Sequence, residues 1–204
     1  MKLFYAPGAC SLAPHIVLEW IGEPYELEKV KLGDPEYTKI NPLGQVPAMI
    51  DNTSEVMTQA SAILEYLAHK YPDADLGDDG TLQGGFTVEH WLAFFTGNVH
   101  PAFYPFFTPA RYVADNNESA LNSVKEASYK LVDKVFTHLE DHLNGKEHFV
   151  GNHRTIVDAY AFTMIRWGNY LPKPLSDYPN LYRFYQQLRG DEGVKRAMEQ
   201  ENID

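Results

Sequence analysis

The first third of the chain alternates between short apolar runs and helical spacing. Residues 2–6 form an apolar run that ends at a Pro-Gly pair, which predicts a buried strand. Residues 11–21 place Leu12, Ile16 and Trp20 on one face and predict a helix that ends at Gly22. A second strand is expected over residues 25–32. This strand–helix–strand order predicts a parallel pair of strands.

Two further strands are expected over residues 46–50 and 55–58, with a polar turn over residues 51–54 between them. Their closeness in the sequence predicts an antiparallel hairpin. Residues 60–71 follow as a helix with Ile63, Leu67 and Tyr71 at four-residue spacing. The order βαβ–ββα therefore predicts a small mixed sheet with helices.

The rest of the chain shows helical spacing and no convincing strand. Residues 73–85 are rich in Gly and Asp, which is typical of a linker. Helices are expected over residues 86–95, 118–143, 155–167, 181–188 and 193–200. The longest carries an expected apolar stripe: Leu121, Val124, Leu131, Val135 and Leu139. We therefore predict an α/β domain over residues 1–76, a linker over 77–85 and an all-α domain over 86–204.

Composition narrows the classes of function. The 204 residues carry a formal net charge of −11 and no Lys/Arg cluster, which argues against nucleic-acid binding. No apolar stretch approaches the roughly 18 residues of a membrane span, so we expect no membrane association. The single cysteine, Cys10, cannot form an intramolecular disulfide. This suits a reducing compartment, and we expect the protein to be cytoplasmic.

Cys10 lies where the first loop meets the first helix. Backbone N–H groups and the helix dipole at such a place lower a thiol pKa, and they can equally stabilise a second thiolate placed beside it. The alternative is a small buried apolar residue, which is common for a lone cysteine. Position alone leaves both interpretations open.

Two other segments are compatible with a peptide ligand. A cis Val46–Pro47 bond would aim the Val46 backbone at an extended peptide, although trans is the default for proline. Gln59, Ala60 and Ser61 open a helix whose free N–H groups suit a carboxylate. Simple capping of this helix by a neighbouring hydroxyl is the default interpretation here.

Histidines are numerous, but their spacing does not predict a metal site. Cys, Asp and Glu complete no recognised metal-ligand spacing with His138, His142, His148 and His153, so a solvated helix face and no metal are expected. His100 lies among aromatic residues and is of interest only if the fold brings it against Cys10. Residues 155–158 carry the pattern of a helix capping box, which indicates a structural role.

Taken together, three segments resemble the glutathione S-transferases, most closely their bacterial beta class. Residues 1–15, with Cys10, are similar to the start of that class. Residues 41–47 resemble the glutathione-site loop with its cis proline, and residues 150–159 resemble the helix-nucleating capping motif. The resemblance covers the whole chain. It implies a thioredoxin-like N-terminal domain, an all-helical C-terminal domain and a homodimer.

The resemblance also implies roles for particular residues. Three would assist the glutathione sulfur: Cys10, Ser11 and His100. Seven would hold the glutathione peptide: Ala9, Gln45, Val46, Pro47, Gln59, Ala60 and Ser61. Four would line an apolar site for the electrophile: Phe103, Phe107, Trp167 and Tyr170. The chain departs from the usual pattern at Gln59–Ala60, where the family has an acidic residue followed by Ser.

The activity implied by the resemblance is conjugation of glutathione to small hydrophobic electrophiles, a reaction of detoxification. Glutathione would be the co-substrate, with no metal. Two alternatives stay open. Cys10 would be the nucleophile of a glutathione-dependent monothiol oxidoreductase. Alternatively, the chain would be a binding protein that kept the fold and lost catalysis, which the departure at Gln59–Ala60 favours.

Overall fold

The computed structural model describes residues 1–53 and 55–204; Ser54, in the predicted turn, lies outside the described residues. Within residues 1–53 and 55–70, the chain forms a four-stranded mixed sheet with three helices. The elements are β1 (Lys2–Tyr5), α1 (Leu12–Ile21), β2 (Glu26–Lys29), α2 (Pro35–Thr38), β3 (Ala48–Ile50), β4 (Val56–Thr58) and α3 (Ala60–Lys70). The order in the sheet is β2-β1-β3-β4, with β1 parallel to β2 and β3 antiparallel to both neighbours. The predicted βαβ–ββα arrangement is confirmed.

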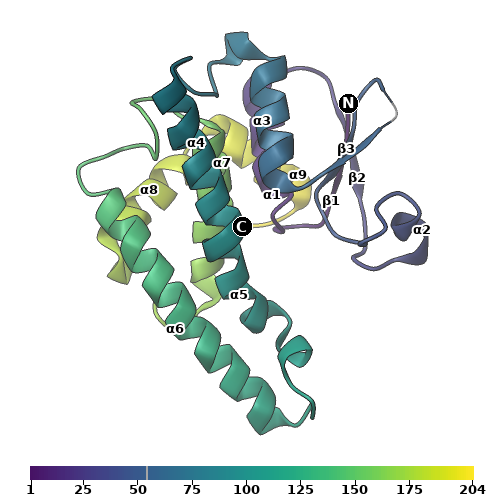
Figure 1. The fold of residues 1–204 in the computed structure, drawn as a ribbon, viewed down its shortest axis with the longest axis vertical. Helices are drawn as coiled ribbons and strands as arrows, with labels where there is room; N and C mark the ends of the chain where they lie inside the picture. Colours follow the sequence, from purple (N-terminus) through teal and green to yellow (C-terminus); the bar gives the residue numbers. More distant parts are fainter. Residues whose placement is uncertain (54) are drawn as a thin grey trace.

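Alternate side chains of the central strands β1 and β3 pack on opposite faces of the sheet. Leu3 and Met49 point into the main core, whereas Phe4 and Ala48 pack with Tyr37 of α2. Figure 1 shows α1 and α3 between the sheet and the helical part, with α2 on the far side. β2 ends at Lys29, earlier than predicted. The short helix α2, whose start is capped by Asp34, is too brief to give a periodic signal.

The remaining chain is helical, as predicted. Its helices are α4 (Leu82–Phe94), α5 (His100–Phe107), α6 (Glu118–His142), α7 (Ile156–Arg166), α8 (Pro179–Arg189) and α9 (Glu192–Glu201). The short turns are η1 (Pro72–Ala74), η2 (Phe95–Val99), η3 (Pro109–Tyr112), η4 (Trp167–Tyr170) and η5 (Leu175–Asp177). α4 begins at Leu82, inside the segment predicted as the linker, because the Thr81 side chain caps it by accepting from Gly84 N–H.

A π-helical turn, η2, joins α4 to α5. Pro101 lacks an N–H, and the His100 N–H bonds the Phe95 carbonyl five residues back. Sequence periodicity missed α5 because Pro101 and Pro105 lie within it. The turn matters because it sets the direction in which His100 enters the next helix.

The predicted stripe on α6 is partly wrong. Leu131 is 47% exposed, and the buried residues of this helix are Ser128, Val132, Phe136 and Leu139. Over 25 residues an apolar stripe drifts around a straight helix, so spacing alone misplaced its centre.

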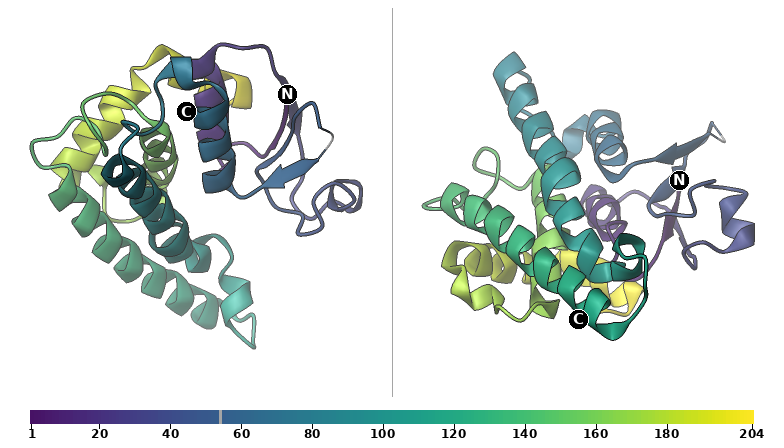
Figure 2. Two further views of the ribbon diagram at one scale, coloured as in Figure 1. Left: turned by 45° about the horizontal axis from the view of Figure 1, so that its top comes forward. Right: turned by 60° about the horizontal axis from the view of Figure 1, so that its bottom comes forward.

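α7 is the central helix of the molecule, and all of its residues are buried. The expected capping box is present, with Asp158 accepting from the Thr155 N–H (2.7 Å) and also from the Phe149 N–H (2.9 Å). α1 packs against both α7 and α9, as the views in Figure 2 show, and so joins the sheet to the helical part.

Candidate active site

The loop between β1 and α1 is held by residues far away in the sequence. Gly8 has a φ of 69°, a conformation that favours glycine. Its N–H donates to Glu201 Oε2 (2.8 Å) and its carbonyl accepts from Trp167 Nε1 (2.8 Å). Glu201 is buried and also contacts His15 Nδ1 at 2.9 Å. The loop that carries Cys10 is therefore fixed by the segment after α7 and by α9.

Cys10 lies beside the start of β3, where its Sγ donates to the Val46 carbonyl at 3.1 Å. Loss of solvation is the largest influence on this thiol, and it raises the Cys10 pKa to about 12. The N–H groups of Cys10 and Ser11 favour the thiolate, but by less. The expectation of a lowered pKa is therefore wrong for this arrangement, because desolvation outweighs the helix N-terminus.

The Ser11 hydroxyl contacts the strand that precedes the loop. Its residue is fully buried, and its hydroxyl contacts both the N–H and the carbonyl of Ala6 at 3.3 Å. This hydroxyl secures the loop behind β1. Direct assistance of a ligand sulfur by this hydroxyl stays a prediction.

The Val46–Pro47 bond is cis, as the resemblance implies and against the default expectation for proline. The preceding Gln45 carbonyl accepts from Tyr37 Oη and Asn41 Nδ2, both at 2.7 Å. Val46 and Pro47 are buried, and the Gln45 side chain is exposed. The loop before β3 is thus fixed by side chains of its own neighbourhood.

Gln59 has an unusual backbone conformation at the start of α3. Its φ of 71° and ψ of 117° are costly for a residue with a side chain. β3 and β4 pair Ala48 with Thr58, so Pro47 and Gln59 leave this ladder side by side.

In the described residues no side chain caps the first N–H groups of α3, so the capping interpretation is not borne out there. Ala60 is buried and Ser61 is half-buried. Ala9, half-buried, packs in the same small cluster as Val46. We call Cys10, Val46, Pro47 and Gln59 the peptide side of the site.

A wall of aromatic rings joins the loop of Cys10, where the Trp167 indole N–H bonds the Gly8 carbonyl. Trp167 lies 5.3 Å from Phe103, 5.2 Å from Phe107 and 5.0 Å from His100, measured between ring centroids. Phe103 and Trp167 are buried, so they support this wall from behind, whereas Phe107 is 43% exposed. The name aromatic side is used below for five residues: His100, Phe103, Tyr104, Phe107 and Trp167.

Tyr104 is the residue that sequence reasoning missed. Its ring centroid is 4.8 Å from that of His100, and it is partly exposed. Its place one helical turn after His100 was the available signal. Tyr170 is exposed outside the cluster, and the Arg166 guanidinium lies over its ring at 5.8 Å.

His100 joins the aromatic side to the loop of Cys10 through Trp167, whose indole N–H bonds Gly8. Burial lowers the pKa of His100 to about 4, so its imidazole is neutral at pH 7. Cys10 and His100 are therefore both neutral at this pH.

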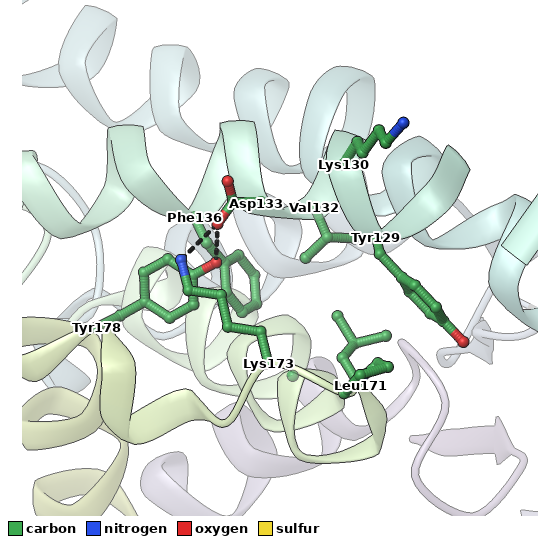
Figure 3. A pocket seen from close by; sticks show the side chains of 10 residues that line it. Tyr129, Lys130, Val132, Asp133, Phe136, Leu171, Lys173 and Tyr178 are labelled. Atoms are coloured by element: carbon green, nitrogen blue, oxygen red, sulfur yellow. Dashed lines mark hydrogen bonds and ion pairs between the residues drawn. The ribbon is translucent and has the colours of Figure 1, made fainter. Parts of the chain in front are cut away.

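A cavity of about 370 Å³ lies behind the aromatic side, between α6 and the segment after α7. In Figure 3 the dashed lines run from Asp133 to Lys173 and Tyr178, which form part of its wall. Phe136 lines the cavity and lies 5.8 Å from Phe103, so the cavity adjoins the aromatic side from the rear.

His138 and His142 both pack on the Trp91 ring. His142 lies 4.1 Å from Trp91, its Nε2 contacts the Phe149 carbonyl at 2.9 Å, and burial lowers its pKa. The expected fully solvated face is therefore wrong for His142. Within residues 1–53 and 55–204, no group of three or more His, Cys, Asp or Glu is placed to hold a metal. Over the same residues, no helix is both long and apolar enough to cross a membrane.

Comparison with known proteins gives matches along both parts of the chain. The family model "Glutathione S-transferase, N-terminal domain" matches residues 1–69, and "Glutathione S-transferase, C-terminal domain" matches residues 95–192. A glutathione S-transferase of Xanthomonas campestris is 36% identical over the full length of both chains. One of Escherichia coli O157:H7 is 33% identical, again over the full length of both.

Solved structures agree with the sequence matches. A bacterial beta class glutathione S-transferase of Sphingomonas chungbukensis superimposes with a TM-score of 0.88 at 35% identity and full coverage of both chains. A sphingomonad glutathione S-transferase complexed with glutathione gives the same TM-score at 32% identity, also with full coverage of both. The matches cover both structural parts and the loops that bring Cys10, Val46 and Gln59 together. The chain therefore belongs to the glutathione S-transferase family.

Proposed function

We propose that this chain conjugates glutathione to small hydrophobic electrophiles, in a reaction of detoxification. The observation that carries the proposal is the juxtaposition of the peptide side with the aromatic side. A cis Val46–Pro47 bond and the uncapped start of α3 suit an extended, anionic peptide. The partly exposed rings of Tyr104 and Phe107 suit an apolar second substrate.

In this proposal the glutathione peptide lies along the start of β3. The Val46 backbone pairs with it, and the first turn of α3 receives its γ-glutamyl end. Gln59 supplies hydrogen bonds without a charge, and Ser61 supplies a hydroxyl one position late. Ala9, Gln45 and Ala60 shape the surroundings of the peptide. Affinity therefore rests mainly on backbone groups.

The glutathione sulfur lies beside Cys10. The Cys10 and Ser11 N–H groups reach toward a sulfur at this place, and they stabilise a thiolate. A neutral Cys10 thiol can donate to the same thiolate, and neutral His100 faces the site from the aromatic side. The sulfur attacks an electron-poor carbon, the C–S bond forms, and the leaving group departs with its electron pair. The thiol proton passes to solvent.

Phe107 and Tyr104 form the exposed surface that contacts the electrophile. Phe103 and Trp167 support these rings from behind, and Tyr170 lies at the edge. Binding both substrates in one place converts a bimolecular step into a positioned one. The apolar wall also favours substrates that leave water readily.

One alternative is favoured by a specific observation. Gln59 and Ala60 lack the charge and the hydroxyl that would anchor the γ-glutamyl group, which suits a protein that binds without turnover. The monothiol oxidoreductase is less favoured, because a Cys10 pKa of about 12 leaves little thiolate at neutral pH.

The decisive measurement is turnover of glutathione with chlorodinitrobenzene, followed by absorbance, beside retention on a glutathione-affinity column. Conjugation above the uncatalysed rate supports the transferase. Retention without turnover would favour the binding protein, and failure of both would remove glutathione as the substrate.

We also propose a homodimer in the cytoplasm. Leu82 is 93% exposed and Phe86 is 61% exposed on α4, and an apolar face of this kind suits a second copy of the chain. One free cysteine suits the reducing cytoplasm. Light scattering should give twice 23.2 kDa at micromolar concentration, and a clean monomer would contradict the dimer.

A further inference from the structure

The cavity behind the aromatic side has no part in the proposed conjugation. Its volume is about 370 Å³, and its walls come from α6 and from the segment that follows α7. In Figure 3 the Val132 side chain points from α6 toward Leu171 on the other wall. A dry apolar cavity of about 150 Å³ holds one benzene molecule, so a cavity of this size admits about two fused rings. The name rear cavity is used below for the space between six of its residues: Val132, Asp133, Phe136, Gly168, Leu171 and Tyr178.

The charges of the rear cavity compensate one another. At one end Asp133 accepts from Lys173 Nζ and from Tyr178 Oη, both at 2.6 Å. Lys173 Nζ also lies 4.0 Å from the centre of the Tyr178 ring. The third charged residue of the wall, Lys130, points away from Leu171 in Figure 3. An occupant therefore meets apolar side chains, aromatic rings and a closed ion pair, which favours an uncharged aromatic molecule over an anion.

Two residues connect the rear cavity to the aromatic side. Phe136 lines the cavity, and its ring centroid lies 5.8 Å from that of Phe103. Gly168 lines it too and directly follows Trp167 in the chain. A Cβ on Gly168 would lie 2.7 Å from Phe136 Cε2, so the Phe136 ring packs directly on the main chain beside Trp167. Because protein interiors are close-packed, a molecule that presses on Phe136 also acts on Phe103 and Trp167.

We propose that the rear cavity is an effector site, which binds an uncharged aromatic molecule of about two fused rings and thereby tightens binding at the aromatic side. An occupant that packs on Phe136 holds its ring against Phe103. An apolar molecule that then binds at the aromatic side orders fewer side chains, so the two ligands bind cooperatively. The inference goes beyond the proposed conjugation, because neither binding event needs glutathione.

The first test is titration calorimetry with naphthamide on the wild-type protein. We expect a dissociation constant of about 100 µM, as the binding energy per atom of small ligands implies. Naphthoate, which has the same rings and a negative charge, should bind about tenfold more weakly, because a net charge of −11 repels it. Absence of naphthamide binding at about 1 mM would overturn the site, and equal or tighter binding of naphthoate would overturn the class of ligand.

Leu171→Trp places the site. Leu171 is half-buried, and a larger side chain there fills the rear cavity, so naphthamide should bind about tenfold more weakly. Leu131→Trp is the matched control, because Leu131 is 47% exposed on α6 and outside the cavity wall. If Leu171→Trp does not fold, Leu171→Ala replaces it and should weaken binding by about threefold through lost contacts. Unchanged affinity in a folded Leu171 variant would overturn the proposal.

The coupling is tested with meta-dinitrobenzene, which has no halide to lose and so reports binding alone. Saturating naphthamide should lower the dissociation constant of meta-dinitrobenzene by about fivefold in the wild type and leave it unchanged in Leu171→Trp. Phe107→Ala should weaken the binding of meta-dinitrobenzene and leave that of naphthamide as it was. Competition between the two compounds would mean one shared site, and independent binding would mean no effector; either would overturn the proposal. Turnover enters none of these measurements, so the proposed conjugation fails or stands separately.

Discussion

The peptide side and the aromatic side of the site are built from different parts of the polypeptide. In the proposed function, the recognition groups of the peptide side belong to the backbone, at the Val46–Pro47 bond and the uncapped start of α3. On the aromatic side they are the side chains of α5 and η4. Backbone groups are present whatever the side chain. The peptide side therefore tolerates Gln59 and Ala60 at positions where a charged side chain and a hydroxyl would bind the γ-glutamyl group more strongly.

The difference teaches where specificity is set. A site made of main-chain donors and acceptors accepts one backbone shape and changes little by substitution. A wall made of side chains changes its shape with each substitution. We therefore expect that substitutions on the aromatic side change which electrophile is preferred and leave the affinity for glutathione constant. The exception is a substitution that disturbs the Gly8 loop, which both sides share.

The largest expected effect comes from that shared loop. Glu201→Ala removes the acceptor of the Gly8 N–H and leaves His15 buried without it. We expect the free energy of unfolding to fall by about 3 kcal/mol and the melting temperature by about 10 °C. Glutathione binding and electrophile turnover should decline together, as differential scanning calorimetry and steady-state kinetics would record.

The matched control for this change is Glu199→Ala, on the exposed face of the same helix, which should stay within about 0.5 kcal/mol of wild type. If Glu201→Ala has the same melting temperature as the Glu199→Ala control, the Gly8 loop does not couple the two sides of the site.

The next effect separates the two sides. Phe107→Ala removes an exposed ring of the aromatic side, and kcat/KM for a hydrophobic electrophile should fall by about tenfold. The dissociation constant of glutathione, measured by calorimetry, should not change. Tyr182→Ala removes an exposed ring on α8 and serves as control. A parallel loss of glutathione affinity in Phe107→Ala would break the comparison.

An increase in glutathione affinity is expected from one substitution on the peptide side. Gln59→Glu supplies a charge opposite the γ-glutamyl ammonium, and a charged hydrogen bond exceeds a neutral one by about 1 kcal/mol. The dissociation constant of glutathione should fall by about fivefold, with electrophile preference unchanged. Gln83→Glu makes the same chemical change on exposed α4 and should leave the affinity as it was. Weaker binding by Gln59→Glu would place the ammonium elsewhere.

The smallest effect concerns Cys10. Because burial raises its pKa to about 12, the thiol is protonated at neutral pH, and its alkylation by iodoacetamide should keep rising with pH up to pH 10 without a plateau. Cys10→Ala should keep conjugating activity within about threefold, because backbone N–H groups still face the glutathione sulfur. A plateau below pH 8 would mean a stable thiolate and would restore the oxidoreductase alternative.

Local patterns predicted most of the fold. The strand–helix–strand start, the hairpin and the capping box of α7 all depend on neighbours in the sequence, and the structure has them. Helical spacing did not predict α5, because Pro101 and Pro105 are residues that usually break a helix. A π-helical turn accommodates the first of them. The extent of α2 was likewise invisible to periodicity.

The site was harder to predict, because its properties depend on burial rather than on residue type. Its place at a helix N-terminus predicts a lowered pKa for Cys10, but burial in the folded chain outweighs that effect and raises the pKa. Sequence position likewise does not show that the Ser11 hydroxyl contacts Ala6.

The fastening of Gly8 has a consequence for the order in which the protein acquires its site during synthesis. Cys10 leaves the ribosome long before Trp167 and Glu201, which hold its loop from 159 and 193 residues beyond Gly8. The sheet and its helices can form early, but the geometry beside Cys10 waits for α9. A nascent chain that stops before α9 therefore exposes the cysteine before any site surrounds it.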